Sequence, residues 1–131
     1  MNNYLLDTNI IINYLHNKEP AVKMINRIKN EHLHINSIVF AEFHVGTMLS
    51  KNTEEQNEQF SGFLKAGAIE IYPIDKQAAF VFAQIQSKQI KKGAKKPALD
   101  MLIAASCIAN DLILVTENKK DFEGIEGLKI C

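Results

Sequence analysis

The chain has 131 residues, and its 47% hydrophobic content is enough for one globular domain with a buried core. Fifteen Lys and Arg residues balance fifteen Asp and Glu residues, so the net charge of zero argues against a broad, strongly basic nucleic-acid binder. No apolar run approaches a membrane span, and the N-terminus lacks the regions of a secretion signal. Two cysteines without metal-ligand spacing favour reduced thiols, and hence a cytoplasmic protein.

Hydrophobic patterning predicts strands that alternate with helices, and no linker or repeat interrupts them. In chain order, we expect a strand at 3–7, helices at 9–15 and 20–28, a strand at 32–36, helices at 37–49 and 53–67, a strand at 69–72, helices at 76–91 and 97–110, and strands at 112–115 and 128–130. Strands that alternate with helices need crossover connections, so the sequence predicts one α/β domain with a central parallel sheet flanked by helices.

Polar residues and prolines mark where the helices begin. Pro20 and Pro97 fit helix starts, where the missing N–H of proline costs nothing. Ser37 and Asp75 are expected N-caps, and Thr53 opens the stretch TEEQ, which is typical of a capping box. Several helices therefore begin close to strand ends, where the ligand crevice of a parallel sheet lies.

Four acidic residues fall near this predicted carboxyl edge of the sheet. Asp7 ends the first strand, Glu42 and Asp100 lie about one turn into their helices, and Asp121 follows the strand 112–115. Each alone could be a capping residue, but four converging carboxylates repel one another unless a cation lies among them. Carboxylates with open water positions are what Mg²⁺ or Mn²⁺ accepts, so the pattern predicts a divalent-cation site.

Four stretches in this order carry a resemblance to a known family: LLDTNIII, SIVFAEFHVG, LDMLIAASCIAND and LILVTENKKDF. The chain resembles the PIN-domain family, specifically the VapC-like toxins of bacterial type II toxin–antitoxin systems. The resemblance implies a PIN-like three-layer sandwich over residues 1–131 and a ribonuclease dependent on Mg²⁺, for which Mn²⁺ can substitute. It also implies a tRNA or rRNA substrate, a homodimer and a cognate antitoxin.

Matching positions carry the family's acidic site onto this chain. Asp7, Glu42 and Asp100 take the three core acidic places. The fourth place varies: Asn118 stands where many relatives carry aspartate, and Asp121 stands where others carry an acidic residue. We expect Asp121 to complete the site, with Asn118 as a neutral helper.

The expected reaction is hydrolysis of an RNA phosphodiester by water activated on a cation that Asp7 and Asp100 hold. Glu42 is expected to act as a water-mediated ligand or as a proton acceptor. Three hydroxyl residues at the same edge either orient ligands or serve only as caps and turn residues. They are Thr8, Ser37 and Thr116.

Five lysines crowd the stretch SKQIKKGAKKP just before Asp100. Such a run is most often a solvated surface, but this one leads to the predicted crevice. We expect it to contact RNA phosphates without reading sequence. The five are Lys88, Lys91, Lys92, Lys95 and Lys96.

Other readings of the same residues remain open at this stage. A non-catalytic PIN-fold module that binds RNA or protein is the main alternative, and Asn118 at the fourth place favours it. A phosphatase with an aspartate nucleophile fits less well, because Asn9 stands where the second aspartate is needed. Apolar residues of the early helices exceed one core face, so they predict either ordinary core or a surface for an antitoxin or second subunit. They are Ile11, Ile12, Tyr14, Leu15, Ile38, Phe40 and Phe43.

Overall fold

The computed structural model describes all residues 1–131 and contains the predicted parallel sheet. Five strands lie in the order β3-β2-β1-β4-β5, and every neighbouring pair is parallel. The strands are β1 (Asn3–Leu6), β2 (His32–Asn36), β3 (Glu70–Tyr72), β4 (Ile113–Val115) and β5 (Lys129–Ile130).

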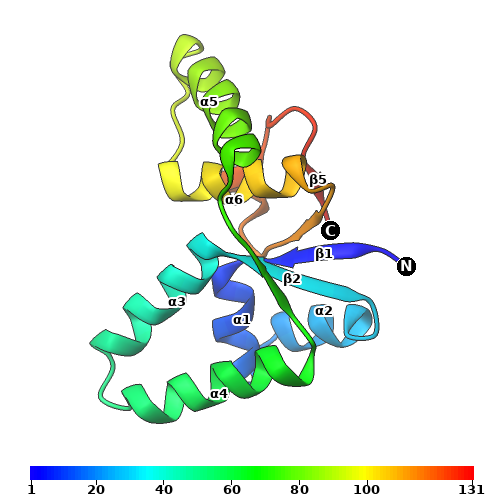
Figure 1. The fold of residues 1–131 in the computed structure, drawn as a ribbon, viewed down its shortest axis with the longest axis vertical. Coiled ribbons are helices and arrows are strands. Elements are labelled where there is room, and N and C mark those ends of the chain that lie inside the picture. Colours follow the sequence, from blue (N-terminus) through cyan, green and yellow to red (C-terminus); the bar gives the residue numbers. More distant parts are fainter.

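Six α-helices cover this sheet, so the predicted α/β sandwich is confirmed. Figure 1 shows α1 to α4 gathered on one side of the sheet and α5 and α6 on the other. None of the helices is both long and apolar enough to span a membrane. They are α1 (Thr8–Leu15), α2 (Ala21–Ile28), α3 (Ser37–Leu49), α4 (Thr53–Ala66), α5 (Lys76–Lys91) and α6 (Ala98–Ala109), and a short 3₁₀ helix η1 (Lys119–Phe122) precedes β5.

The central position of β1 determines where a site can form. Leu5 of β1 is in register with His34 of β2 on one side and with Leu114 of β4 on the other. The chain therefore builds the sheet outward from β1, first through β2 and β3 and then through β4 and β5. The order of strands reverses beside β1, and the crevice at such a switch point is where parallel sheets bind ligands.

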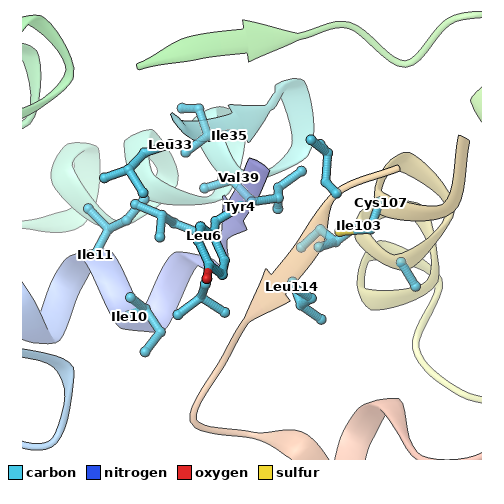
Figure 2. Close-up of a cluster of buried hydrophobic side chains, with 14 of the residues drawn as sticks. Tyr4, Leu6, Ile10, Ile11, Leu33, Ile35, Val39, Ile103, Cys107 and Leu114 are labelled. Atoms are coloured by element: carbon cyan, nitrogen blue, oxygen red, sulfur yellow. The ribbon is translucent and has the colours of Figure 1, made fainter. Parts of the chain in front are cut away.

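The core fills the space between β1, β2 and β4 and the helices on both faces. Figure 2 shows Ile10 and Ile11 of α1 on one side and Ile103 and Cys107 of α6 on the other, with Leu6 between them. All five are at most 1% exposed. Burial of this kind, and not helix propensity, is the main stabilising contribution to such short elements.

Most of the surplus apolar residues of the early helices belong to this core. Ile11 and Phe43 are buried. Ile12, Tyr14, Leu15 and Ile38 pack against the core as partly buried side chains. Phe40 alone of the seven stays exposed, at 38% of its surface. The ordinary-core interpretation therefore holds for six of them.

The helix starts differ from the sequence prediction at two places. Asn36, and not Ser37, caps α3, because its Oδ1 accepts from the N–H of Val39 at 2.9 Å. Thr53 does not form a capping box, since its hydroxyl donates instead to carbonyls of the preceding turn. The Asp75 cap of α5 is confirmed by its bond from the N–H of Ala78.

Candidate functional site

Asp7 lies at the point where β1 ends and α1 begins. Its extended backbone donates an N–H to the carbonyl of Val115 at 3.0 Å, so the pairing of β1 with β4 continues through Asp7. The side chain is 6% exposed and caps α1: Oδ1 accepts from the N–H of Thr8 at 2.9 Å. Oδ2 accepts from the hydroxyl of Thr116 at 2.8 Å. The buried carboxylate is thus held by groups from two neighbouring elements.

Glu42 reaches the same place from α3. Its Oε1 accepts the hydroxyl proton of Thr8 at 2.8 Å. Thr8 therefore connects both carboxylates, through its backbone to Asp7 and through its side chain to Glu42. This contact joins residues 34 positions apart in the chain.

Asp100 and Asp121 complete a group of four acidic residues. Asp100 lies in the first turn of α6 and is partly buried, and Asp121 lies in the exposed first turn of η1. Asp7, Asp121 and Glu42 all act electrostatically on Asp100. The fold thus brings together the four carboxylates that the sequence predicted, from three helices and one strand end.

Burial and mutual repulsion alter the proton affinity of two of these groups. Burial raises the pKa of Asp100 to about 6, with further increases from Asp7, Asp121 and Glu42, while Lys96 acts in the opposite direction. Burial also raises the pKa of Asp7, although the hydrogen bonds from Thr116 and Thr8 oppose the shift. Such shifts in a cluster of neighbouring carboxylates are typical of functional sites.

The donor atoms of this cluster suit a hard divalent cation. Carboxylate and hydroxyl oxygens are the ligands that Mg²⁺ prefers, and neighbouring negative charges are what a cation relieves. The structure contains no group of three or more His, Cys, Asp or Glu side chains arranged to hold a metal ion. This is compatible with Mg²⁺, which keeps several waters and takes only one or two carboxylates.

The neutral candidates at the edge have different surroundings. Thr116 is fully buried and, besides bonding Asp7, accepts from the N–H of Asn118 at 3.0 Å. It therefore ties Asp7 to the turn before η1. The Asn118 side chain is exposed and makes no capping bond. The Ser37 hydroxyl makes its hydrogen bond to a main-chain group and not to one of the carboxylates. It donates to the carbonyl of Tyr72 at 3.4 Å.

Two residues that stabilise the same turn were not predicted. The amide of Asn13 in α1 donates to Oε2 of Glu117 at 2.9 Å, and the other oxygen of Glu117 is buried without a partner. This bond joins α1 to the turn that carries Thr116. The two residues are 104 positions apart, so no local spacing could have indicated the contact.

The five lysines do not all stand in one environment. Lys96 is partly buried, and its carbonyl accepts from the amide of Gln86 at 3.4 Å. Its charge also acts on Asp100 and opposes the rise in the pKa of that carboxyl. Lys88 forms an ion pair with Glu126 at 3.2 Å. The remaining three, Lys91, Lys92 and Lys95, are exposed.

Comparisons with known proteins agree with this architecture. The sequence profile of the PIN domain matches residues 4–128. Ribonuclease VapC2 of Rickettsia felis is 34% identical over 128 residues, covering 95% of this chain and 93% of that protein. The tRNA(fMet)-specific endonuclease VapC of Salmonella typhimurium is 29% identical, covering 97% and 95%. The crystal structure of VapBC2 from Rickettsia felis bound to a promoter DNA fragment superposes with a TM-score of 0.88 at 27% identity, covering 98% of this chain and 97% of that one. The chain belongs to the PIN domain family.

The raised pKa of Asp100 predicts that its charge destabilises the fold in the absence of divalent cations. The folded protein holds the Asp100 proton up to about pH 6, whereas the unfolded chain releases it near 3.8, so this stability is present at low pH and lost as the pH rises through 6. Asp100→Asn should therefore be more stable than the parent at about pH 8, by about 1 kcal/mol after allowing for solvent screening.

Urea unfolding in EDTA at several pH values measures this difference, which should disappear below about pH 4. Glu54→Gln is the matched control, because Glu54 also lies in a first helical turn, that of α4, but is exposed to solvent. Equal stability changes for the two variants at every pH would contradict the electrostatic origin of the shift.

Proposed function

We propose that this chain is an endoribonuclease, the toxin of a toxin–antitoxin pair. The observation that carries the proposal is the convergence of Asp7, Glu42, Asp100 and Asp121 at the switch point of the sheet, with a raised pKa at Asp7 and Asp100. Membership of the PIN domain family supports it, as do relatives named ribonuclease VapC and tRNA-specific endonuclease VapC.

The proposed cofactor is Mg²⁺, with Mn²⁺ as a substitute, held by Asp7 and Asp100. When bound, such a cation supplies a water of lowered pKa and neutralises charge at the phosphate. The protein's own contribution is orientation: Thr116 and the N–H of Thr8 fix the Asp7 carboxylate through both of its oxygens. Hydrogen bonds of this kind set the direction in which a carboxylate presents its remaining lone pairs.

Glu42 is the proposed proton acceptor for the attacking water. The Thr8 hydroxyl occupies its Oε1, which leaves Oε2 to take a proton. Asp121 is the proposed fourth acidic residue, because it acts electrostatically on both Asp7 and Asp100. Asn118 carries no charge to contribute, and its role is limited to the turn that positions Thr116.

The proposed substrate is a structured RNA, such as tRNA or rRNA. The lysines that lead into α6 supply positive charge beside the acidic cluster, and Lys96 lies near enough to act on Asp100. A phosphate backbone that runs over these lysines reaches the crevice without requiring a basic net charge. The same surface in a non-catalytic module would bind RNA without cleaving it.

The proposed partners are a cognate antitoxin and a second copy of the chain. Solved structures that superpose on this chain are VapBC complexes from Rickettsia felis and Salmonella typhimurium. In this chain, α3 leaves a row of large apolar side chains uncovered, namely Val45, Met48 and Leu49, with exposures of 59%, 73% and 84%. Contiguous apolar surface of this kind is typical of protein contacts.

Removing either proposed cation ligand should abolish cleavage without unfolding the protein. Asp7→Asn and Asp100→Asn keep the shape of each side chain but lose the charge, so we expect RNA cleavage in Mg²⁺ to fall by at least about a hundredfold. Gel assays of tRNA and rRNA with purified variants, with Mg²⁺ and then with excess EDTA, measure the effect.

Asp111→Asn is the control, because Asp111 lies on the surface in an ion pair with Lys129. It should cleave like the parent. RNA binding without cleavage in the parent protein, or cleavage that persists in EDTA, would contradict a metal-dependent ribonuclease and favour the binding module.

The lysines should contribute to RNA affinity through charge alone. Lys92→Glu combined with Lys95→Glu should weaken RNA binding and reduce the salt dependence of the binding constant, because fewer counterions are released. Binding measured in EDTA at several salt concentrations reports the slope.

A double variant at two other exposed lysines, Lys29→Glu with Lys51→Glu, changes the net charge equally. It lies outside the proposed RNA surface and should leave the slope close to that of the parent. Identical slopes for both double variants would assign the lysine run to solubility.

A further inference from the structure

A cavity of about 200 Å³ opens between α5, the end of α6 and the segment that follows η1. In Figure 1 this segment, coloured orange to red, rises beside α5 before the chain enters β5. Apolar side chains form part of its lining, among them Ile85, Ile108 and Ile125. The cavity lies outside the group of four carboxylates, and none of its lining residues belongs to that group.

Gln89 gives this cavity a polar group with no partner in the chain. Its side chain is only 6% exposed and lines the cavity, and its amide takes part in none of the side-chain hydrogen bonds of the fold. Both polar atoms of this carboxamide stay accessible from the cavity, since neither is among the fully buried side-chain atoms that lack a partner. It can donate and accept at the same time, so a flat ligand with adjacent donor and acceptor atoms satisfies it best.

Three charged side chains line the cavity, two lysines and one glutamate, so its lining carries one net positive charge. Lys88 and Lys92 both line it and belong to the lysine run. Lys88 is paired with Glu126 across the opening, whereas Lys92 has no ion pair. The cavity and the run are therefore parts of one surface, and its charge complements a ligand that carries phosphate.

We propose that this cavity receives one unstacked base of the RNA substrate. The Gln89 carboxamide hydrogen-bonds the edge of the base, the isoleucine side chains flank its ring, and Lys92 contacts the adjoining phosphate. Protein recognition of single-stranded RNA commonly takes this form, with a splayed base read along its edge. The inference rests on the proposed function, because that function makes RNA the phosphate-bearing ligand.

The test is binding of short single-stranded RNAs made of A, C, G or U alone, measured by fluorescence anisotropy in EDTA. The parent protein should prefer one base by about tenfold, the discrimination of a good two-bond contact. Gln89→Leu should abolish that preference. Lys92→Ala should weaken all four RNAs alike and reduce the salt slope by about one.

Gln77→Leu makes the same chemical change at an exposed position of α5 outside the cavity, and it should keep the preference. EDTA blocks metal-dependent cleavage, so the assay measures RNA binding alone. The base-binding cavity and the proposed ribonuclease activity can therefore fail independently of each other. A base preference that depends on Gln89 in a protein that cleaves nothing supports the cavity alone. Cleavage by a protein without base preference, or with one that Gln89→Leu retains, overturns it.

A second measurement does not depend on how the variant folds. Nucleoside 5′-monophosphates added to the parent protein should shift the amide NMR signals of Gly124 and Ile125, which line the cavity, and leave Gly62 in α4 unchanged. Shifts of equal size at all three, or at none, overturn the proposal.

Discussion

The buried carboxylate of Asp7 is the constraint on which the rest of the site depends. It ends the central strand, caps α1 and accepts the hydroxyl of Thr116 from the next strand. These two hydrogen bonds do not fully replace water, because burial still raises the pKa of Asp7. Glu42 and Asp121 add negative charge around it, and the pKa of Asp100 rises with them. The fold therefore maintains an electrostatic repulsion that a bound cation would relieve, and this repulsion is the physical reason for proposing the reaction site at this edge.

The sequence predicts the kind of fold well, because its signals are local. Apolar strands and amphipathic helices alternate clearly enough to indicate a parallel sheet, and that prediction is confirmed. The N-cap of α3 is harder to predict, because Asn36 and Ser37 are adjacent and both are good N-cap residues. Only the hydrogen bond from the N–H of Val39 to Asn36 distinguishes them. The apolar surplus of the early helices was also ambiguous. Periodicity shows that Ile12 and Tyr14 are apolar, but which neighbour covers them depends on how α1, α3 and α4 pack together.

The four acidic residues that the fold brings together could be selected from the sequence, but the contacts that orient them could not. A strand-end rule is enough to select Asp7, because the residue follows an apolar strand directly. Its bond from Thr116 spans 109 positions, and the order of the sheet alone brings the two together. The lysine run likewise predicts a charged surface, but nothing in its spacing separates Lys96, beside Asp100, from Lys88, which is paired with Glu126. The unpartnered Gln89 becomes visible only with the packing of α5 against the C-terminal segment.

The most direct test of the central claim is calorimetric titration of Mg²⁺ into the protein, in two buffers of different ionisation enthalpy. This measurement gives the binding constant together with the number of protons released. At about pH 6, where the Asp100 carboxyl is half protonated, binding should release about half a proton, and the release should fall towards zero at about pH 8. Failure to bind Mg²⁺, or binding with no proton release at the lower pH, would contradict the claim that the carboxylate cluster binds a divalent cation.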